Sequence, residues 1–154
     1  MPQINDVGAL RDWLRTCPVI PRESAFGVDY LGDTPDGYAL CSMPAEAKYR
    51  ENILGETALL PRQNRDFRLD ARMPYGADPG QNLDNLARMR AIADWVRTRS
   101  AEGELPAWSA GRVIAVVPGL SAGPTDVASG TARYRMGLRV VVEMSEPGTG
   151  NGNS

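Results

Sequence analysis

The clearest pattern in the chain is the stretch GTARYRMGLRVVVEM, residues 130–144. Apolar and polar side chains alternate there with a period of two, as in a β-strand that buries one face. The inward side chains are expected to be Ala132, Tyr134, Met136, Leu138, Val140, Val142 and Met144. The outward side chains are Thr131, Arg133, Arg135, Arg139 and Glu143. Three arginines on one face could meet nucleic acid, solvent or another protein subunit.

A second stretch, from Arg62 to Met73, alternates in the same way and predicts another strand. Its inward side chains are Phe67, Leu69, Ala71 and Met73. Its outward side chains are Asp66, Arg68, Asp70 and Arg72, in which acidic and basic residues alternate. If both strands belong to one sheet, the two charged rows share a face and lie close together, within one subunit or across a subunit boundary.

Apolar residues at three- and four-residue spacing predict two helices. The first is expected from Asp6 to Thr16, with Asn5 or Asp6 as its N-cap and Pro18 ending it. The second is expected from Pro79 to Ser100, with Asp78 as its N-cap. Its expected core side chains are Leu83, Leu86, Met89, Ile92, Ala93 and Val96.

The rest of the chain gives shorter signals. Phe26 to Tyr30 and Tyr38 to Leu40 are expected to form a hairpin around the turn-rich sequence GDTPDG. Residues 45–60 fit either a short helix or an irregular excursion. The apolar run 112–117 predicts an interior strand. The glycine- and proline-rich stretch from Pro118 to Gly130 predicts a long mobile loop.

This order of elements predicts an α+β fold: a mixed or antiparallel sheet of about five strands with two main helices packed on one face. One domain is expected over residues 1–145, with a flexible polar tail at 146–154.

Composition narrows the function classes. The net charge is −2, although sixteen of the seventeen basic residues are arginine and only Lys48 is lysine. Dedicated nucleic-acid binders usually carry a strong basic excess, which this chain lacks. No apolar run reaches the length of a membrane span, and the N-terminus lacks the pattern of a signal peptide, so we expect a protein made and kept in a cytosol. Cys17 and Cys41 are expected to be free buried thiols.

Candidate chemistry is sparse, because the chain contains no histidine. The sequence GLSAG, residues 119–123, matches the G-x-S-x-G pattern of serine hydrolases, but that chemistry needs a histidine base. Ser121 is therefore expected to be a loop serine. Asp29, Asp33 and Asp36 miss the spacing of a calcium loop and fit turns. We expect no catalytic residue, no metal site and no cofactor.

Four stretches in this order resemble a known family: FGVDYLGDTPDGYAL, YGADPGQNLDNLARMRAIADWV, the GELP connection, and GTARYRMGLRVVVEM. Together they are similar to the tail terminator or tail-completion proteins of tailed bacteriophages, often called minor tail proteins. The resemblance spans roughly Ile4 to Met144 and omits the segment around residues 45–61 and the C-terminal tail. It implies a small domain with helices on a sheet and no catalytic residues.

The resemblance also implies a role. Such proteins form a six-membered ring at the head-proximal end of the tail tube, where the ring stops tube growth and meets the head connector. The implied partners are other copies of the chain, the tail tube protein, a head connector or neck protein and possibly a sheath, with DNA only passing through the channel. The implied location is the virion, assembled in the host cytoplasm.

The charged strand faces suit a surface that meets other subunits. The expected interface residues are Asp66, Arg68, Asp70, Arg72, Arg133, Arg135, Arg139 and Glu143. Three alternatives stay open: a solvated sheet face, a neck or head-completion protein of the same particle, and a binding module or enzyme unrelated to phage.

Overall fold

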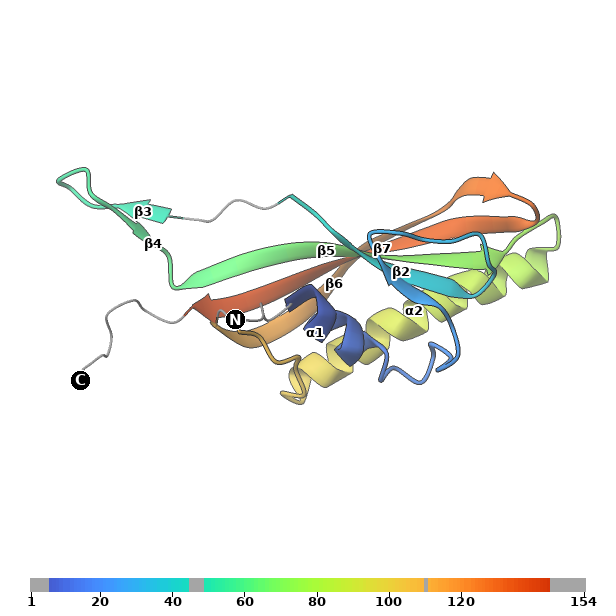
Figure 1. Ribbon diagram of the computed structural model, residues 1–154, viewed down its shortest axis with the longest axis horizontal. Helices are drawn as coiled ribbons and strands as arrows, with labels where there is room; N and C mark the ends of the chain where they lie inside the picture. Colours follow the sequence, from blue (N-terminus) through green and yellow to red (C-terminus); the bar gives the residue numbers. More distant parts are fainter. Residues whose placement is uncertain (1–5, 45–48, 110, 145–154) are drawn as a thin grey trace.

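The computed structural model describes residues 6–44, 49–109 and 111–144. It confirms the α+β class (Figure 1). The elements in chain order are α1 (Asp6–Leu14), β1 (Phe26–Val28), β2 (Gly37–Ser42), β3 (Tyr49–Glu51), β4 (Thr57–Leu59), β5 (Arg62–Pro74), α2 (Pro79–Ala101), β6 (Gly111–Ala128) and β7 (Thr131–Met144). The expected C-terminal tail, the Asn5 cap and residues 45–48 lie outside the described residues.

The main sheet has five strands in the order β1-β2-β5-β7-β6, and β3 and β4 form a separate small sheet. The long strands β5 and β7 are antiparallel neighbours from the pair Arg62 and Glu143 to the pair Pro74 and Thr131. The two charged rows predicted from the sequence therefore stand side by side in one subunit, as expected.

Both helices lie on the same face of the main sheet (Figure 1). The helix-facing side chains of β7 from Ala132 to Val142 are all buried, so its predicted alternation is confirmed. Trp13 of α1 meets Trp95 of α2 with 4.9 Å between ring centroids, which joins the two helices above the core. Leu10 and Leu14 of α1 are completely buried.

The hairpin expected between Phe26 and Leu40 is wrong, because β1 and β2 are parallel neighbours with Phe26 beside Tyr38. Parallel strands need a connection that travels back along the sheet. Residues 29–36 provide it, with Asp29 and Asp36 at positive φ. Aspartate tolerates that conformation, so the same turn residues serve a return loop as readily as a tight hairpin.

The long loop expected from Pro118 to Gly130 is also wrong, because β6 continues through it to Ala128. β6 is an edge strand and pairs with β7 alone, with register shifts at four places. An edge strand needs hydrogen bonds on one side only, so it accommodates prolines and bulges that an interior strand does not. Residues 49–59, expected to form a short helix or an irregular excursion, instead contain the regular β3–β4 hairpin.

Helix α2 begins at Pro79, as predicted, and ends one residue beyond the predicted Ser100; Asp78 caps it by accepting a hydrogen bond from the Gly80 amide. Its expected core stripe is only partly right, because Leu83 and Leu86 are 64% and 53% exposed. Asn85 takes the inward position instead and donates to the Pro74 carbonyl at 2.7 Å. The first turns of α2 therefore pack through a polar contact and leave two leucines uncovered.

Cys17 and Cys41 are both free and buried, as expected. Burial raises the pKa of each thiol, and the nearby carboxylate of Asp70 raises the pKa of Cys41 further.

Leu10→Ala should lower the free energy of unfolding by about 2–5 kcal/mol, because it opens a cavity between α1 and the sheet. Leu83→Ala is the matched control and should change it by less than about 0.5 kcal/mol, because Leu83 is mostly in water. Urea denaturation monitored by circular dichroism measures both. Equal losses would mean that α2 packs differently from the arrangement described.

Candidate interface on the open face of the sheet

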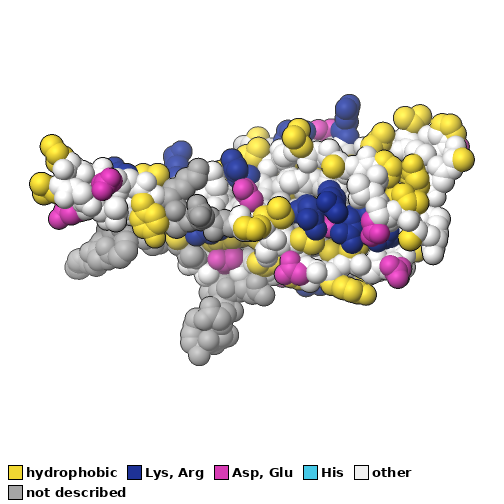
Figure 2. Space-filling view, turned by 90° about the horizontal axis from the view of Figure 1, so that it is seen from above, with side chains coloured by type: hydrophobic (Ala, Val, Ile, Leu, Met, Phe, Trp, Pro, Cys, Tyr) yellow, Lys and Arg dark blue, Asp and Glu magenta, His cyan; other side chains and the backbone are white. Residues whose placement is uncertain are grey.

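The face of the main sheet opposite the helices is called the open face below. Figure 2 looks onto it and shows arginines gathered near the middle of the molecule. They belong to β5 and β7, because every second residue of these strands points to this side. Five arginines, Arg68, Arg72, Arg133, Arg135 and Arg139, share the face with Asp66, Asp70 and Asp126. The open face therefore carries more positive than negative charge.

Asp70 stands at the centre of this arrangement, and its side chain is only 1% exposed. Arg68 donates two hydrogen bonds to it, at 2.7 and 3.0 Å. Arg133 reaches the same carboxylate at 3.5 Å. A buried carboxylate is costly unless it is paired and hydrogen-bonded, so these two arginines are needed where they lie.

Arg72 is also buried, with a side chain 4% exposed, so it is not available to a partner. It donates to the Asp126 carboxylate and to the Asp126 carbonyl, each at 2.9 Å. Arg133 lies 3.6 Å from the same carboxylate. The hydrogen bond from Arg72 and the positive charges around it lower the pKa of Asp126.

Two further pairs lie in more exposed positions. Arg139 makes a two-point contact with Asp66 at 2.9 and 3.2 Å. Glu143 accepts from Arg112 of β6 at 2.7 Å, near the other end of the sheet. Of the eight predicted interface residues, seven thus form ion pairs inside the subunit, and two of these, Asp70 and Arg72, are buried.

Arg135 is the exception. Within the described part of the chain its buried Nε has no hydrogen-bond acceptor, and its guanidinium joins no ion pair. It lines a hollow of about 480 Å³ on the open face, between β5, β7 and β6. The hollow forms where Gly137 interrupts the row of large side chains on β7, directly opposite Arg68.

The walls of this open-face hollow are mainly apolar. Met43, Val117 and Leu120 line it, and these side chains are 40%, 48% and 94% exposed. Apolar walls beside an unpaired guanidinium suit a ligand that has both an apolar part and a carboxylate. The sequence pattern did not single out these three side chains: it predicted an interior strand at Val117, where β6 is in fact an edge strand, and a loop at Leu120.

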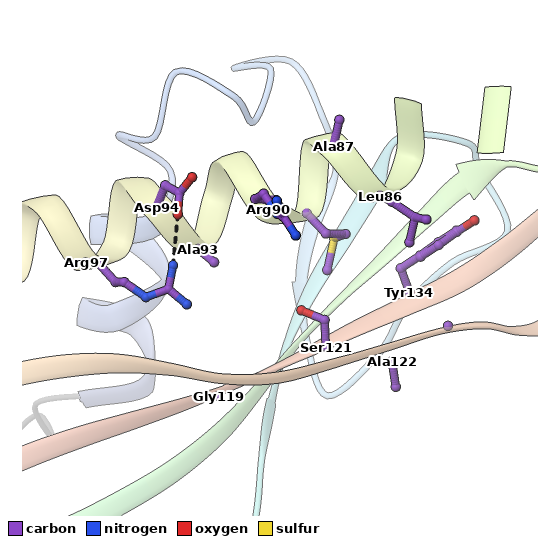
Figure 3. A pocket seen from close by; sticks show the side chains of 12 residues that line it. Leu86, Ala87, Arg90, Ala93, Asp94, Arg97, Gly119, Ser121, Ala122 and Tyr134 are labelled. Atoms are coloured by element: carbon purple, nitrogen blue, oxygen red, sulfur yellow. Dashed lines mark hydrogen bonds and ion pairs between the residues drawn. The ribbon is translucent and has the colours of Figure 1, made fainter. Parts of the chain in front are cut away.

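A second concavity, of about 760 Å³, lies between α2 and β6 on the helix side of the sheet. Figure 3 shows Ser121 pointing from β6 toward α2, while Ala122 points away. Within the described part of the chain, the Ser121 hydroxyl makes no hydrogen bond to another side chain. Arg97, which also lines the concavity, is paired with Asp94 at 2.8 Å. With no histidine in the chain, Ser121 has no base of the hydrolase kind.

The β3–β4 hairpin projects beyond the end of the main sheet (Figure 1). Every residue from Tyr49 to Leu59 is exposed. Asn52 holds the turn, because its side-chain oxygen accepts from the amides of Leu54 and Glu56 at 2.9 and 3.0 Å. The turn presents Ile53 and Leu54 to water, 97% and 79% exposed. A ready-made turn with an apolar tip is typical of a contact segment.

Among the described residues, no three His, Cys, Asp or Glu side chains gather where they could hold a metal ion. In the same part of the chain, neither helix offers a stretch both long and apolar enough to cross a lipid bilayer.

Comparisons with known proteins leave the function to be argued from this geometry. No protein-family model matches the chain, and no curated protein matches it. One solved structure is similar over 91% of this chain and 92% of its own, with 16% sequence identity and a TM-score of 0.44. A likeness this distant carries no argument about function.

Asp70→Asn should lower the free energy of unfolding by about 3 kcal/mol, because it leaves Arg68 and Arg133 without their buried counter-charge. Asp66→Asn removes a carboxylate from the same strand face but from a half-exposed pair, and should change stability little. Chemical denaturation compares the two. A larger loss for Asp66→Asn would contradict the central place given to Asp70.

Asp126 should make stability depend on acid pH. Its pKa in the folded chain lies below the ordinary value of 3.8, so its contribution is complete above that pH and is lost as the pH falls through the lowered pKa. Wild type should therefore be more stable than Asp126→Asn at neutral pH, and the difference should shrink below pH 3.8. Denaturation curves of both proteins at several pH values check this. A difference that grows on acidification would refute it.

Proposed function

We propose that the protein is a structural subunit that closes into a ring and acts as the tail terminator of a tailed bacteriophage. The observation that carries the proposal is the separation of two exposed apolar patches on one subunit. One is the tip of the β3–β4 hairpin with Ile53 and Leu54, and the other surrounds Leu120 on β6. Exposed apolar groups that gather in patches usually mark contact sites.

Two different contact patches on one subunit favour head-to-tail assembly, in which one patch binds the other patch on the next copy. A contact between unlike surfaces of identical subunits repeats from copy to copy, and it ends only when the rotation closes a ring. The tail terminators that the sequence resembles form such rings, with six subunits. We therefore assign the subunit to a hexameric ring.

In this proposal the ring sits at the head-proximal end of the tail tube, within the virion. It stops addition of tube subunits on one side and presents a surface for the head connector or neck protein on the other. A sheath, where the tail has one, would contact its outer rim, and DNA would pass through the channel without being read. None of these tasks requires a catalytic group or a cofactor.

Purified protein should form closed rings, most of them sixfold, when its concentration is raised. Mass photometry gives the number of subunits, and negative-stain electron microscopy shows whether the assembly is closed. Added to polymerising tail tube protein, the rings should cap tube ends and shorten the tubes.

A matched control is the same experiment with protein denatured and left unfolded, which should not shorten tubes. Rings that bind the head connector but leave tube length unchanged would indicate a neck or head-completion protein instead. A protein that stays monomeric at all concentrations and leaves tubes unchanged would overturn the proposal.

A further inference from the structure

The β3–β4 hairpin has the features of a segment that packs against a partner. Each of its strands has three residues, and all of them are exposed. Isolated two-stranded hairpins are only marginally stable in water. Its tip is held in shape by Asn52 and by Gly55 at φ +85°, yet its two apolar side chains lie in water. The hairpin is therefore shaped for a contact outside the subunit.

The hairpin also carries charge on both sides of its tip. Glu51 and Glu56 flank Ile53 and Leu54, and the single basic residue of the hairpin is Arg50. Glu56 already accepts a hydrogen bond from the Asn52 side-chain amide at 2.8 Å. Glu51 forms no ion pair with the described residues. The tip thus offers two apolar side chains and one free carboxylate.

The open-face hollow has the matching properties. Arg135 supplies an unpaired guanidinium, and Met43, Val117 and Leu120 supply exposed apolar walls. The excess of arginine over aspartate on this face favours an acidic partner, because opposite potentials attract over several ångströms. The other concavity, between α2 and β6, also has an exposed leucine, Leu86, among its lining residues, and of the two arginines that line it Arg97 is already paired with Asp94.

Pairing through sheet edges is a weaker alternative for the same assembly. The edge strand β6 contains Pro118 and Pro124 and several register shifts, which interrupt the row of backbone groups that another strand would need. The opposite edge strand, β1, has only three residues. Neither outer edge of the main sheet offers a long regular strand, so we expect contacts between subunits to use side chains.

We infer that the tip of the β3–β4 hairpin of one subunit docks into the open-face hollow of a second copy of this chain. Ile53 and Leu54 lie against the apolar walls, and Glu51 pairs with Arg135. This contact rests on the proposed ring, because it joins two unlike patches of identical subunits. The apolar side chains supply the affinity, and the charge pair fixes the register.

Cross-linking tests the contact directly. Leu54→Cys protein mixed with Leu120→Cys protein should give a disulfide-linked dimer on mild oxidation, since the native cysteines are buried. The control mixture is Leu54→Cys with Leu86→Cys, which probes the concavity between α2 and β6. A dimer from the control and none from the first mixture would overturn the inference.

Assembly measurements test the energetics. Leu54→Asp should raise the concentration for half-assembly by about tenfold or more, while the folded monomer is unchanged because Leu54 is exposed. Glu51→Gln and Arg135→Gln should each weaken assembly, and the double variant should be no weaker than either, because the two groups pair. Additive losses would refute the pair. Glu23→Gln, an exposed carboxylate away from the hairpin, is the control.

Failure of this contact and failure of the proposed function give different results. If wild-type rings cap tubes but the Leu54→Cys and Leu120→Cys proteins do not cross-link, the subunits meet elsewhere and the inference is wrong. If the cross-link forms but the assemblies are open chains that leave tube growth unchanged, the contact stands and the tail-terminator function is wrong.

Discussion

The pairing of β5 with β7 places a carboxylate, Asp70, in a buried position at the centre of the open face. That carboxylate requires the guanidinium groups of Arg68 and Arg133. The register of the two strands also sets Arg72 directly opposite Arg133, two like charges that would repel each other. Asp126 of β6 lies close to both and relieves the repulsion. The far end of β6 is therefore held against the sheet by the ion pairs that Asp126 makes with Arg72 and Arg133.

The parts of the fold that the sequence predicts well are those with local periodicity. The alternation in β7 and β5 and the length of α2 need only neighbouring residues to be recognised. The direction of β1 relative to β2 and the continuation of β6 depend on which strand lies alongside. Turn and breaker residues such as those of Pro118–Gly130 signal an interruption, but on an edge strand they produce bulges instead. The local sequence pattern of a segment does not show which strand pairs with it.

The sequence predicted which charged residues share the open face. It did not predict which of them are buried or already paired within the subunit. Sequence alternation correctly assigned the arginines of β7 and the charges of β5 to one face. It could not show that opposite charges on adjacent strands neutralise each other within the subunit, as Arg139 and Asp66 do. The residue in the sequence that marks the open-face hollow is Gly137, because it leaves a gap in a row of long side chains on β7. A gap of this kind marks a hollow only after the strands on both sides have been identified.

Whether an arginine of the open face is already paired decides whether it can bind a partner. Arginines already held by aspartates gain little from a new partner, because they would exchange one ion pair for another. An arginine without a partner gains a full charge-assisted hydrogen bond when a carboxylate arrives. One such group beside a few apolar side chains gives a weak contact by itself. In a closed ring each subunit holds two neighbours, so leaving requires breaking two contacts at once, and a contact that is weak alone becomes sufficient. A small hairpin and a shallow hollow are thus better suited to a ring than to a pair of subunits.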